Sequence, residues 1–431
     1  MSKRVIQQLD NGIRVILQEA HNAPVISFWV AYNVGSRNEP RGKTGLSHWV
    51  EHMMFKGTER FPAGVLDREI DRAGGTWNAF TGTDNTMYYE TLPANRIELA
   101  LAAEADRMIN AQFASEDVES ERTVIISERQ GSENSPTFWL MDAVRKAAFT
   151  QHGYHHDILG EMDDLQTITR EQLHAHYQSH YSTSNATIVA VGAFNSATML
   201  AQIDDYFGAI PARPAPELYV QHEPYQNAER RITIERGGNT AFLSLAHRVP
   251  NGTHDDWYVL EVIDSILTGT GTGLETKTTR LHKALIKTGL AASIDGGMSE
   301  TVDPYIYSLN ATLTDGITHE EVERVLLDEL ARLSSEGVTD RELNRAKKQA
   351  RASFAYSLDS VTNQAYWLAQ SAMLGNVNWY DEFIHRLDAV THDDIRCVAA
   401  KYFVPEGRTV GWLIPTGVAD DYDYEYEEAE V

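Results

Sequence analysis

The alternation of hydrophobic and polar residues predicts strands at the start of the chain and again near its middle. Residues 1–20 (MSKRVIQQLDNGIRVILQEA) alternate on both sides of a DNG turn signal, which is typical of two strands joined by a turn. The segment VISFWVAYNV (25–34) continues the pattern, and RITIERG (231–237) and AFLSLAHRV (241–249) repeat it in the second half. Each half is therefore expected to contain a sheet.

Two longer segments show the 3.6-residue repeat of amphipathic helices. Residues 98–125 (ELALAAEADRMINAQFASEDVESERTVI) predict a helix, a capped loop and the start of a second helix. Residues 320–349 (EEVERVLLDELARLSSEGVTDRELNRAKKQ) show the same order about 225 residues later. The alternative is a chance likeness of two unrelated helix pairs. We predict an α+β fold of two similar α/β sandwich domains, each an antiparallel-rich sheet covered by helices, related by duplication.

The midpoint of the chain predicts a linker. Residues 210–231 (IPARPAPELYVQHEPYQNAERR) contain four prolines, which interrupt the hydrogen bonding of both helices and sheets. The halves on either side have an ordinary domain size. We predict an N-terminal domain at 1–212, a linker at 213–230, a homologous C-terminal domain at 231–419 and an acidic tail at 420–431.

Composition narrows the class of protein. The chain has 431 residues, of which 42% are hydrophobic and 23% charged, as in soluble globular proteins. No apolar run reaches the roughly 18 residues of a membrane span, and the first residues lack the apolar core of a signal peptide. These features predict a cytoplasmic protein. The single cysteine, Cys397, excludes an intramolecular disulfide and a thiolate metal site.

The formal net charge of −25 argues against nucleic acids and anionic membranes as partners, because phosphate groups would be repelled. Part of this charge lies in the final segment DDYDYEYEEAEV, for which we expect a solvated, disordered tail. Docking of a basic peptide on this tail is the alternative.

The segment GLSHWVEHMMFKGT (45–58) is the main candidate for chemistry. His48 and His52 are four residues apart, so on a helix both imidazoles face one side and can bind one metal ion. Glu51 lies beside them, where a carboxylate can take a proton from water. The order is the inverted H-x-x-E-H motif. The alternative is a solvated helix face, since chance gives such a motif in roughly one chain of this composition in twenty.

A third ligand is expected from another element. Residues 118–130 (VESERTVIISERQ) place Glu121 and Glu128 seven positions apart, two turns along one helical face. Val124 and Ile125 between them are expected to form an apolar stripe that seats this helix on the core.

These residues resemble the pitrilysin/insulysin-type zinc peptidases, a family that includes the mitochondrial processing peptidases, and they are most similar to its bacterial members of the processing-peptidase type. The resemblance extends over essentially the whole chain. Besides the two histidines and the glutamate of the motif, VGSRNEP before it and MMFKGTERFP after it match the family. So do the E-x6-E pair, at the family's interval from His52, and GGTWNAFTGTDNTMYYETLP (74–93).

The resemblance implies a zinc-dependent endopeptidase that hydrolyses peptides or unfolded polypeptide segments. It implies one zinc ion per chain, held by His48, His52 and Glu128, with Glu51 as general base on a zinc-bound water. Glu121 is expected to support the site. The family's substrate-binding edge strand falls on Asn78, Ala79 and Phe80, which implies that a peptide backbone pairs there. The alternative is a non-catalytic structural or assembly subunit, as some relatives are, although every catalytic position is present.

One family feature is missing. In the family's second half, an arginine and a tyrosine seven residues apart hold the substrate near the zinc. The matching stretch here is RLHKALIKTGLAASIDGG (280–297), with Ile286 at the arginine place and Ala292 or Ser293 at the tyrosine place. The resemblance therefore implies a catalytic subunit that pairs with a homologous, zinc-free partner as a heterodimer. In isolation the chain is expected to homodimerise with weak activity or none.

Two other signals are expected to be structural. TGTGTGL (268–274) lacks the phosphate-loop pattern and predicts a flexible loop. GYHHDILG (153–160) has His155 and His156 adjacent, which chelate one ion poorly, and is read as a turn.

Overall fold

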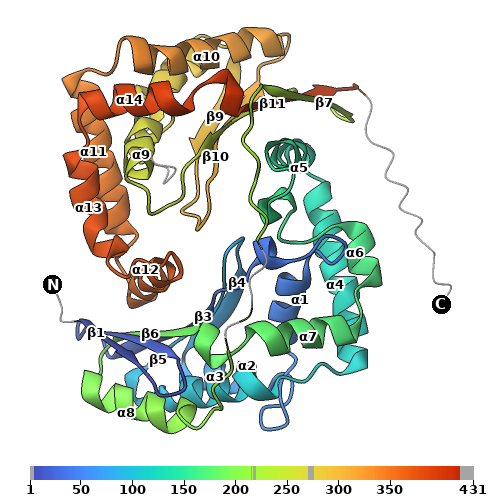
Figure 1. Cartoon of the computed structure of the whole chain (residues 1–431), viewed down its shortest axis with the longest axis vertical. Coiled ribbons are helices and arrows are strands. Elements are labelled where there is room, and N and C mark those ends of the chain that lie inside the picture. The colour runs from blue at the N-terminus through green and yellow to red at the C-terminus, as the bar shows by residue number, and fades with distance from the viewer. Residues whose placement is uncertain (1–3, 215, 217–219, 270–275, 418–431) are drawn as a thin grey trace.

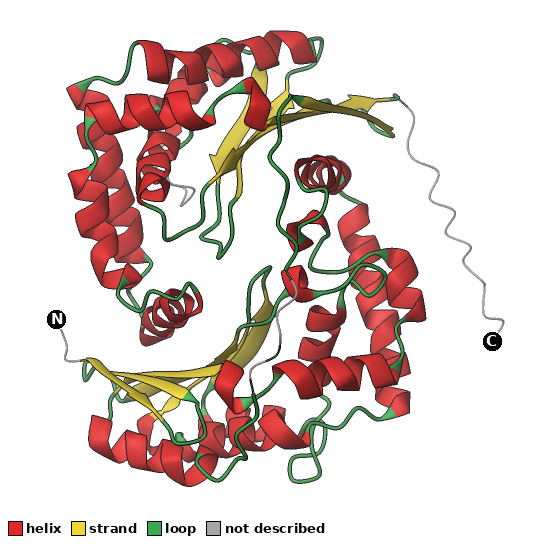
Figure 2. Cartoon of the chain, viewed as in Figure 1, coloured by secondary structure: helices red, strands yellow, loops and turns green. Residues whose placement is uncertain are grey.

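The computed structural model describes residues 4–214, 216, 220–269 and 276–417. Two sheets, each flanked by helices, form an N-terminal lobe (residues 4–208) and a C-terminal lobe (residues 230–415) (Figures 1 and 2). This arrangement confirms the predicted α+β class. The described residues between the lobes, within 211–229, form neither helix nor strand, as a linker would. The acidic tail and most of the TGTGTGL segment lie outside the described residues.

The first sheet has the strand order β1-β2-β6-β3-β5-β4. Its strands are β1 (Arg4–Gln8), β2 (Arg14–Glu19), β3 (Val25–Tyr32), β4 (Thr76–Thr81), β5 (Thr86–Pro93) and β6 (Ala186–Gly192). The second sheet has the order β7-β11-β8-β10-β9. Its strands are β7 (Arg230–Arg236), β8 (Phe242–Val249), β9 (Ala291–Gly297), β10 (Tyr305–Leu313) and β11 (Arg408–Pro415).

The two sheets have the same topology once β1 is set aside. In each sheet the first strand pairs in parallel with the last strand of its lobe, as β2 does with β6 and β7 with β11. The remaining neighbours are antiparallel in both sheets, and the edge strand is β4 in one and β9 in the other. Identical connectivity over five strands supports the predicted duplication more strongly than the sequence pattern does.

Part of the helix order repeats as well. Apart from α5, the helices within residues 4–208 are α1 (Leu46–Met53), α2 (Val65–Ala73), α3 (Glu98–Asn110), α4 (Ser115–Glu133), α6 (Met162–Thr167), α7 (Arg170–His180) and α8 (Ser196–Phe207). Those of the C-terminal lobe are α9 (Asp255–Leu267), α10 (His319–Ser335), α11 (Asp340–Tyr356), α13 (Trp379–Ala389) and α14 (His392–Tyr402). Helices α4 and α11 start about 225 residues apart, as the sequence repeat predicts.

Two helices of equal length are exchanged between the lobes. Helix α5 (Pro136–Ala148), which follows α4, packs on the second sheet through Leu140 and Val144. Helix α12 (Val361–Met373), which follows α11, packs on the first sheet through Leu368 and its neighbours. Figure 1 shows α5 beneath β11 and α12 above β3 and β6. Each lobe therefore covers one face of its sheet with its own helices and receives the cover of the other face from its counterpart.

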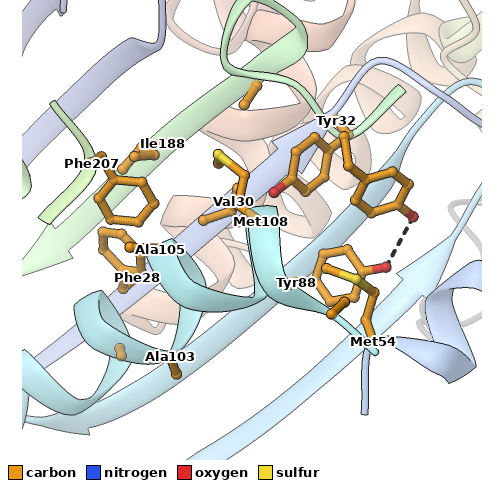
Figure 3. Close-up of a cluster of buried hydrophobic side chains, with 14 of the residues drawn as sticks. Phe28, Val30, Tyr32, Met54, Tyr88, Ala103, Ala105, Met108, Ile188 and Phe207 are labelled. Atoms are coloured by element: carbon orange, nitrogen blue, oxygen red, sulfur yellow. Dashed lines mark hydrogen bonds between the residues drawn. The ribbon is translucent and has the colours of Figure 1, made fainter. Parts of the chain in front are cut away.

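The core of the N-terminal lobe shows how strand alternation divides the two faces. Phe28, Val30 and Tyr32 of β3 point to the lobe's own helices, where they meet Met108 of α3 and Tyr88 of β5 (Figure 3). The residues between them on β3 face α12 instead. Strand β3 is thus buried on both faces, which explains its nearly continuous hydrophobic sequence.

Within the described ranges, none of the helices combines the length and the apolar character that crossing a bilayer requires.

Candidate metal centre

Helix α1 begins at a fixed point because its N-terminus is capped by a buried carboxylate. The Glu39 side chain accepts hydrogen bonds from the backbone N–H of Gly45 at 2.7 Å and of Ser47 at 2.6 Å. Gly45 has a φ of 92°, a left-handed conformation that favours glycine. His156 lies 3.1 Å from Glu39 through Nε2. The GYHHDILG turn therefore has a structural role, as the sequence predicts, and this role is to hold the cap of α1.

The structure brings the three predicted zinc ligands together. The Nε2 atoms of His48 and His52 lie 3.7 and 3.8 Å from the same Glu128 carboxylate oxygen. One ligand atom of each residue lies within 4.8 Å of the other two, and the imidazole rings are 4.6 Å apart between centroids. Two residues of α1 thus converge with one residue of α4, although the chain between them is 75 residues long.

The donor set fits zinc. Two imidazole nitrogens and one carboxylate oxygen are a usual catalytic zinc set, and ligand bonds of about 2.0–2.2 Å place tetrahedral ligand atoms about 3.4 Å apart. The separations seen here are slightly wider, and Glu128 is 46% exposed, so its side chain has room for the small adjustment. Cys397 lies exposed on α14, in the C-terminal half of the chain, and does not belong to this cluster.

Burial prepares His48 for metal binding. The imidazole is buried, and this burial, assisted by the neighbouring His52, lowers the pKa of His48 to about 4. The ring is therefore neutral at physiological pH, which is the state that binds metals. Within the described part of the chain, its Nδ1 atom has no hydrogen-bond partner.

Glu121 lies behind His52 rather than among the ligands. Its Oε2 atom is 2.9 Å from His52 Nδ1, so the imidazole presents Nε2 to Glu128. Lys56 makes an ion pair with the other carboxylate oxygen. Burial alone would raise the pKa of Glu121, but the hydrogen bonds from Lys56 and His52 outweigh it, and the pKa is lowered. A carboxylate that is charged and fixed in this way orients an imidazole and increases its basicity.

Helix α4 is seated on the core by a different stripe from the predicted one. Ile125 is fully buried, as expected, but Val124 is 46% exposed, so the predicted Val124–Ile125 stripe is wrong in one residue. The buried positions are Val118, Glu121, Ile125 and Arg129, each three or four residues from the next. Adjacent residues on a helix point about 100° apart, so two neighbours cannot both face the core centrally.

Glu51 is buried next to the candidate ligands and receives one hydrogen bond. The Thr81 hydroxyl of β4 donates to Glu51 Oε2 at 2.6 Å. Burial raises the pKa of the Glu51 carboxyl, while the hydrogen bond from Thr81 works against that rise. A raised pKa is typical of carboxylates that exchange protons with a substrate.

Three residues that support the candidate site were not predicted from the sequence: Thr81, Lys56 and Glu39. The signal for Lys56 and Glu39 was present, because both lie in segments that match the family on either side of the motif. Thr81 lies in the GGTWNAFTGTDNTMYYETLP element, but its contact with Glu51 joins two elements and has no local pattern.

The predicted substrate strand β4 is an edge strand, paired only with β5 among the described strands. Asn78 is exposed, and its side-chain oxygen accepts a hydrogen bond from the Ala79 backbone N–H at 2.9 Å. Ala79 is half-buried, and Phe80 packs near Trp29 and near Tyr366 of α12. The other edge of β4 therefore has no strand partner among the described residues, which is the arrangement that strand addition requires.

The three residues at the missing arginine and tyrosine positions lie on β9 or in the turn before it. Ile286 ends a π-helical turn (His282–Ile286) and packs against the core of the C-terminal lobe. Ala292 and Ser293 are exposed on β9, and the Ser293 hydroxyl donates to Thr312 at 2.8 Å. Ile286 and Ala292 have no polar side-chain atom to offer a peptide.

The chain is similar to known peptidases over most of its length. The model "Insulinase (Peptidase family M16)" matches residues 14–162, and the model "Peptidase M16 inactive domain" matches residues 167–350. The chain is similar to the zinc protease PqqE of Helicobacter pylori, at 28% identity over 94% of this chain and 92% of that protein. It is also similar to a probable mitochondrial-processing peptidase subunit beta of Arabidopsis thaliana, at 26% identity over 97% of this chain and 80% of that protein.

Among solved structures, a protease from Helicobacter pylori matches with a TM-score of 0.91 and 26% identity. The match covers 96% of this chain and all of that one. The ligand cluster lies in the part that matches the insulinase model, and the exchanged helix α5 lies there as well.

Proposed function

The chain belongs to the insulinase (M16) family of peptidases, and one of the relatives named above is a zinc protease; from this premise we propose that the chain is a zinc-dependent endopeptidase. Its substrates are peptides or unfolded polypeptide segments. The observation that carries the proposal is the convergence of the His48 and His52 imidazoles with Glu128, next to the buried Glu51 carboxylate.

We assign the roles from these contacts. His48, His52 and Glu128 hold one zinc ion, which when bound polarises the scissile carbonyl and makes water a better nucleophile. Glu51 takes the proton of the attacking water and passes it to the leaving amine. Thr81 holds the Glu51 carboxylate, and Glu121, fixed by Lys56, holds the His52 ring.

The edge of β4 is the proposed place of the substrate backbone. Asn78, Ala79 and Phe80 lie on this edge strand, and Thr81 at its end contacts Glu51. A peptide that adds a strand here runs past the general base and binds through its main chain. Such binding reads side chains only weakly, so we expect broad cleavage specificity.

We further propose that the chain is the catalytic subunit of a two-chain enzyme. Ile286, Ala292 and Ser293 offer no arginine or tyrosine where the family clamps its substrate. A homologous partner without the zinc motif would supply them, and the relative named as a processing-peptidase subunit beta is named as one subunit of a larger enzyme. A cytoplasmic location stays a prediction from the sequence.

The second candidate is a non-catalytic subunit of the same family, since the second model is named for an inactive domain. That match covers residues 167–350, which contain none of the proposed zinc ligands. The intact ligand set in the other half favours the peptidase.

Digestion of a diverse peptide mixture by the purified chain, read by mass spectrometry, separates the two candidates. We expect hydrolysis that a chelator stops and added zinc restores, and that Glu128→Ala abolishes. Glu116→Ala is the matched control, because Glu116 is an exposed carboxylate on the same helix. Metal-independent cleavage, or zinc-free protein from careful preparation, would contradict the proposal.

The two-chain form needs its own test, namely purification from the native cell. A homologous, zinc-free subunit is expected to co-purify and to raise the activity of the isolated chain. Full activity of the isolated chain, with no such subunit recovered, would contradict the division of labour but not the peptidase.

A further inference from the structure

A basic cavity lies in the C-terminal lobe, outside the proposed metal centre. It occupies about 640 Å³ where the end of α10, the start of α11 and residues 277–287 meet. Of the thirteen residues that line it, seven are lysine or arginine and two are glutamate. The chain as a whole carries a net charge of −25, so this concentration of positive charge is opposite to the general character of the protein.

Two arginines in the wall have donors that no described residue accepts. Arg280 is 10% exposed and donates through Nε and Nη2 to Glu342 at 2.7 and 3.1 Å, but its buried Nη1 has no partner among the described residues. Arg345 donates through Nη1 to the Thr278 carbonyl at 2.8 Å, while its Nε and Nη2 atoms are buried without a partner in the described chain. Buried donors of charged groups are normally satisfied, so these atoms indicate a missing acceptor.

The two carboxylates of the cavity are already engaged. Glu342 accepts the hydrogen bonds of Arg280, and Glu336 lies 3.1 Å from Arg332. Lys283 and Lys287 are exposed and make no ion pair with any described residue. The pKa of Arg345 is lowered, first by burial and then by the charges of Arg341 and Arg280. The wall is therefore electrostatically unfavourable without an anion.

We propose that this cavity binds a small ligand that carries several phosphate groups. Guanidinium groups match phosphate oxygens in a two-pronged geometry, and lysines add point charges for the same oxygens. The cavity has the size of small-molecule sites. Val338 is the one aliphatic side chain among the described residues that line the cavity, and none of these residues is aromatic. The cavity therefore offers no stacking surface for a nucleobase. The ligand class is therefore a phosphate chain or a phosphorylated polyol.

The position of the cavity gives such a ligand a structural effect. Lys283 lies within the π-helical turn that precedes β9 and Lys287 directly follows that turn, whereas Arg345 lies on α11. A polyanion that binds these lysines and Arg345 together would link the turn to α11. The proposed metal ligands lie in the other lobe, so this cavity is a separate site from the proposed metal centre.

Calorimetric titration of the zinc-loaded full chain with sodium tripolyphosphate at low salt tests the proposal. We expect one site per chain, at least tenfold weakening in the double variant Lys283→Ala/Lys287→Ala, and further weakening as salt is added. The control is Lys347→Ala/Lys348→Ala, which removes the same charge from α11 outside the cavity. Tripolyphosphate also chelates zinc, but the zinc site is the same in all three proteins, so the difference between the two double variants isolates the cavity.

Absence of binding by the unmodified chain would overturn the proposal, as would equal weakening in both double variants. Inorganic phosphate serves as the second probe and should bind at least tenfold more weakly than tripolyphosphate, because it engages fewer of the cationic groups. Equal affinity for the two probes would overturn the requirement for several phosphate groups.

Discussion

In the N-terminal lobe, the helix after β3 is α1, which carries His48, Glu51 and His52. In the C-terminal lobe, the helix after the corresponding strand β8 is α9, whose sequence DDWYVLEVIDSIL contains no histidine. Helix α4 supplies Glu121 and Glu128, and the offset of about 225 residues places Ala346 and Ser353 of α11 at their positions. The two lobes thus share the order of five strands and the helix exchange, but only the N-terminal lobe carries the candidate metal-binding side chains at these positions.

The acidic residues of α9 show what the C-terminal lobe has in place of a metal centre. Burial raises the pKa of Glu261 to about 8 and that of Asp264 to about 6. Asp264 accepts hydrogen bonds from the hydroxyls of Tyr307 and Thr268, both at 2.8 Å. The Asp264 carboxylate is therefore engaged in hydrogen bonds within the C-terminal lobe. The C-terminal lobe therefore has the same strand order without a cluster of candidate metal ligands among its described residues. The N-terminal lobe differs by five side chains that form the candidate catalytic site: His48, Glu51, His52, Glu121 and Glu128.

The largest expected effect is that of His52→Ala. The variant should lose both zinc and peptide hydrolysis, because two ligands hold the ion much less tightly than three. Ser353→Ala, at the position that corresponds to Glu128, should change neither. Zinc content by elemental analysis and hydrolysis of a peptide mixture measure both. Full zinc content in His52→Ala, or zinc loss in Ser353→Ala, would contradict the assignment of the metal site to the N-terminal lobe alone.

Removing the metal should leave both lobes folded. A core of this size does not depend on one ion, unlike that of a zinc finger. Thermal unfolding of His52→Ala and of chelator-treated protein should therefore stay close to that of the unmodified chain. A large decrease in the melting temperature would show that the N-terminal lobe, unlike its counterpart, needs the metal to fold.

The next effect is that of Glu51→Gln, which should lower kcat by about a hundredfold or more while zinc stays bound. The amide keeps the shape of the side chain and its contact with Thr81, but it cannot accept a proton from water. Steady-state kinetics on a cleaved peptide, with zinc content measured on the same sample, provide the test. Near-normal turnover in the zinc-loaded variant would remove Glu51 from its proposed role.

Truncating one buried side chain on each exchanged helix tests whether the two lobes depend on each other for stability. Leu368 of α12 is buried against the first sheet, and Leu140 of α5 is buried against the second sheet. Leu368→Ala and Leu140→Ala should each lower the free energy of unfolding by about 2–5 kcal/mol. Because each helix joins the two cores, both lobes should lose stability together in urea unfolding followed by tryptophan fluorescence.

Val124→Ala is the control for these truncations, since Val124 is exposed on α4. It should change the free energy of unfolding by about 0.5 kcal/mol or less. Separate transitions for the two lobes in Leu368→Ala would show that the helix exchange does not couple them.

A smaller effect is expected from Glu121→Gln. The amide loses the charge that pairs with Lys56 and that favours the orientation of His52. Zinc affinity should weaken by about 10- to 100-fold, as for other residues that hold a metal-binding histidine. Competition with a zinc-sensitive chelating dye measures this affinity, and an unchanged value would mean that Glu121 is not needed to orient the ring.

The smallest effect is that of Thr81→Val, which removes one hydrogen bond to Glu51. The loss of about 0.5–1.5 kcal/mol corresponds to a decrease in kcat of about two- to tenfold, with KM and zinc content unchanged. Thr81→Ser keeps the hydroxyl and should restore most of the activity. If Thr81→Ser were as slow as Thr81→Val, packing rather than the hydrogen bond would explain the loss.

Much of the framework and of the site could be read from local patterns. Two-residue alternation identified β2, β3, β7 and β8, and the 3.6-residue repeat identified α3, α4, α10 and α11. Helical geometry alone places residues four apart on one face, so the spacing of His48 and His52 was sufficient to predict that their imidazoles lie together. The seven-residue spacing of Glu121 and Glu128 placed both on one side of α4 in the same way.

The remaining features depend on contacts between distant segments, for which one sequence carries no periodic signal. The approach of Glu128 to the two imidazoles, the hydrogen bond from Thr81 to Glu51 and the capping of α1 by Glu39 each join separate elements. The exchange of α5 and α12 is of the same kind, because an apolar helix face is equally suited to either sheet. Val124 was misassigned since its side chain is as hydrophobic as that of Ile125, and only the packing of α4 decides which of the two faces the core.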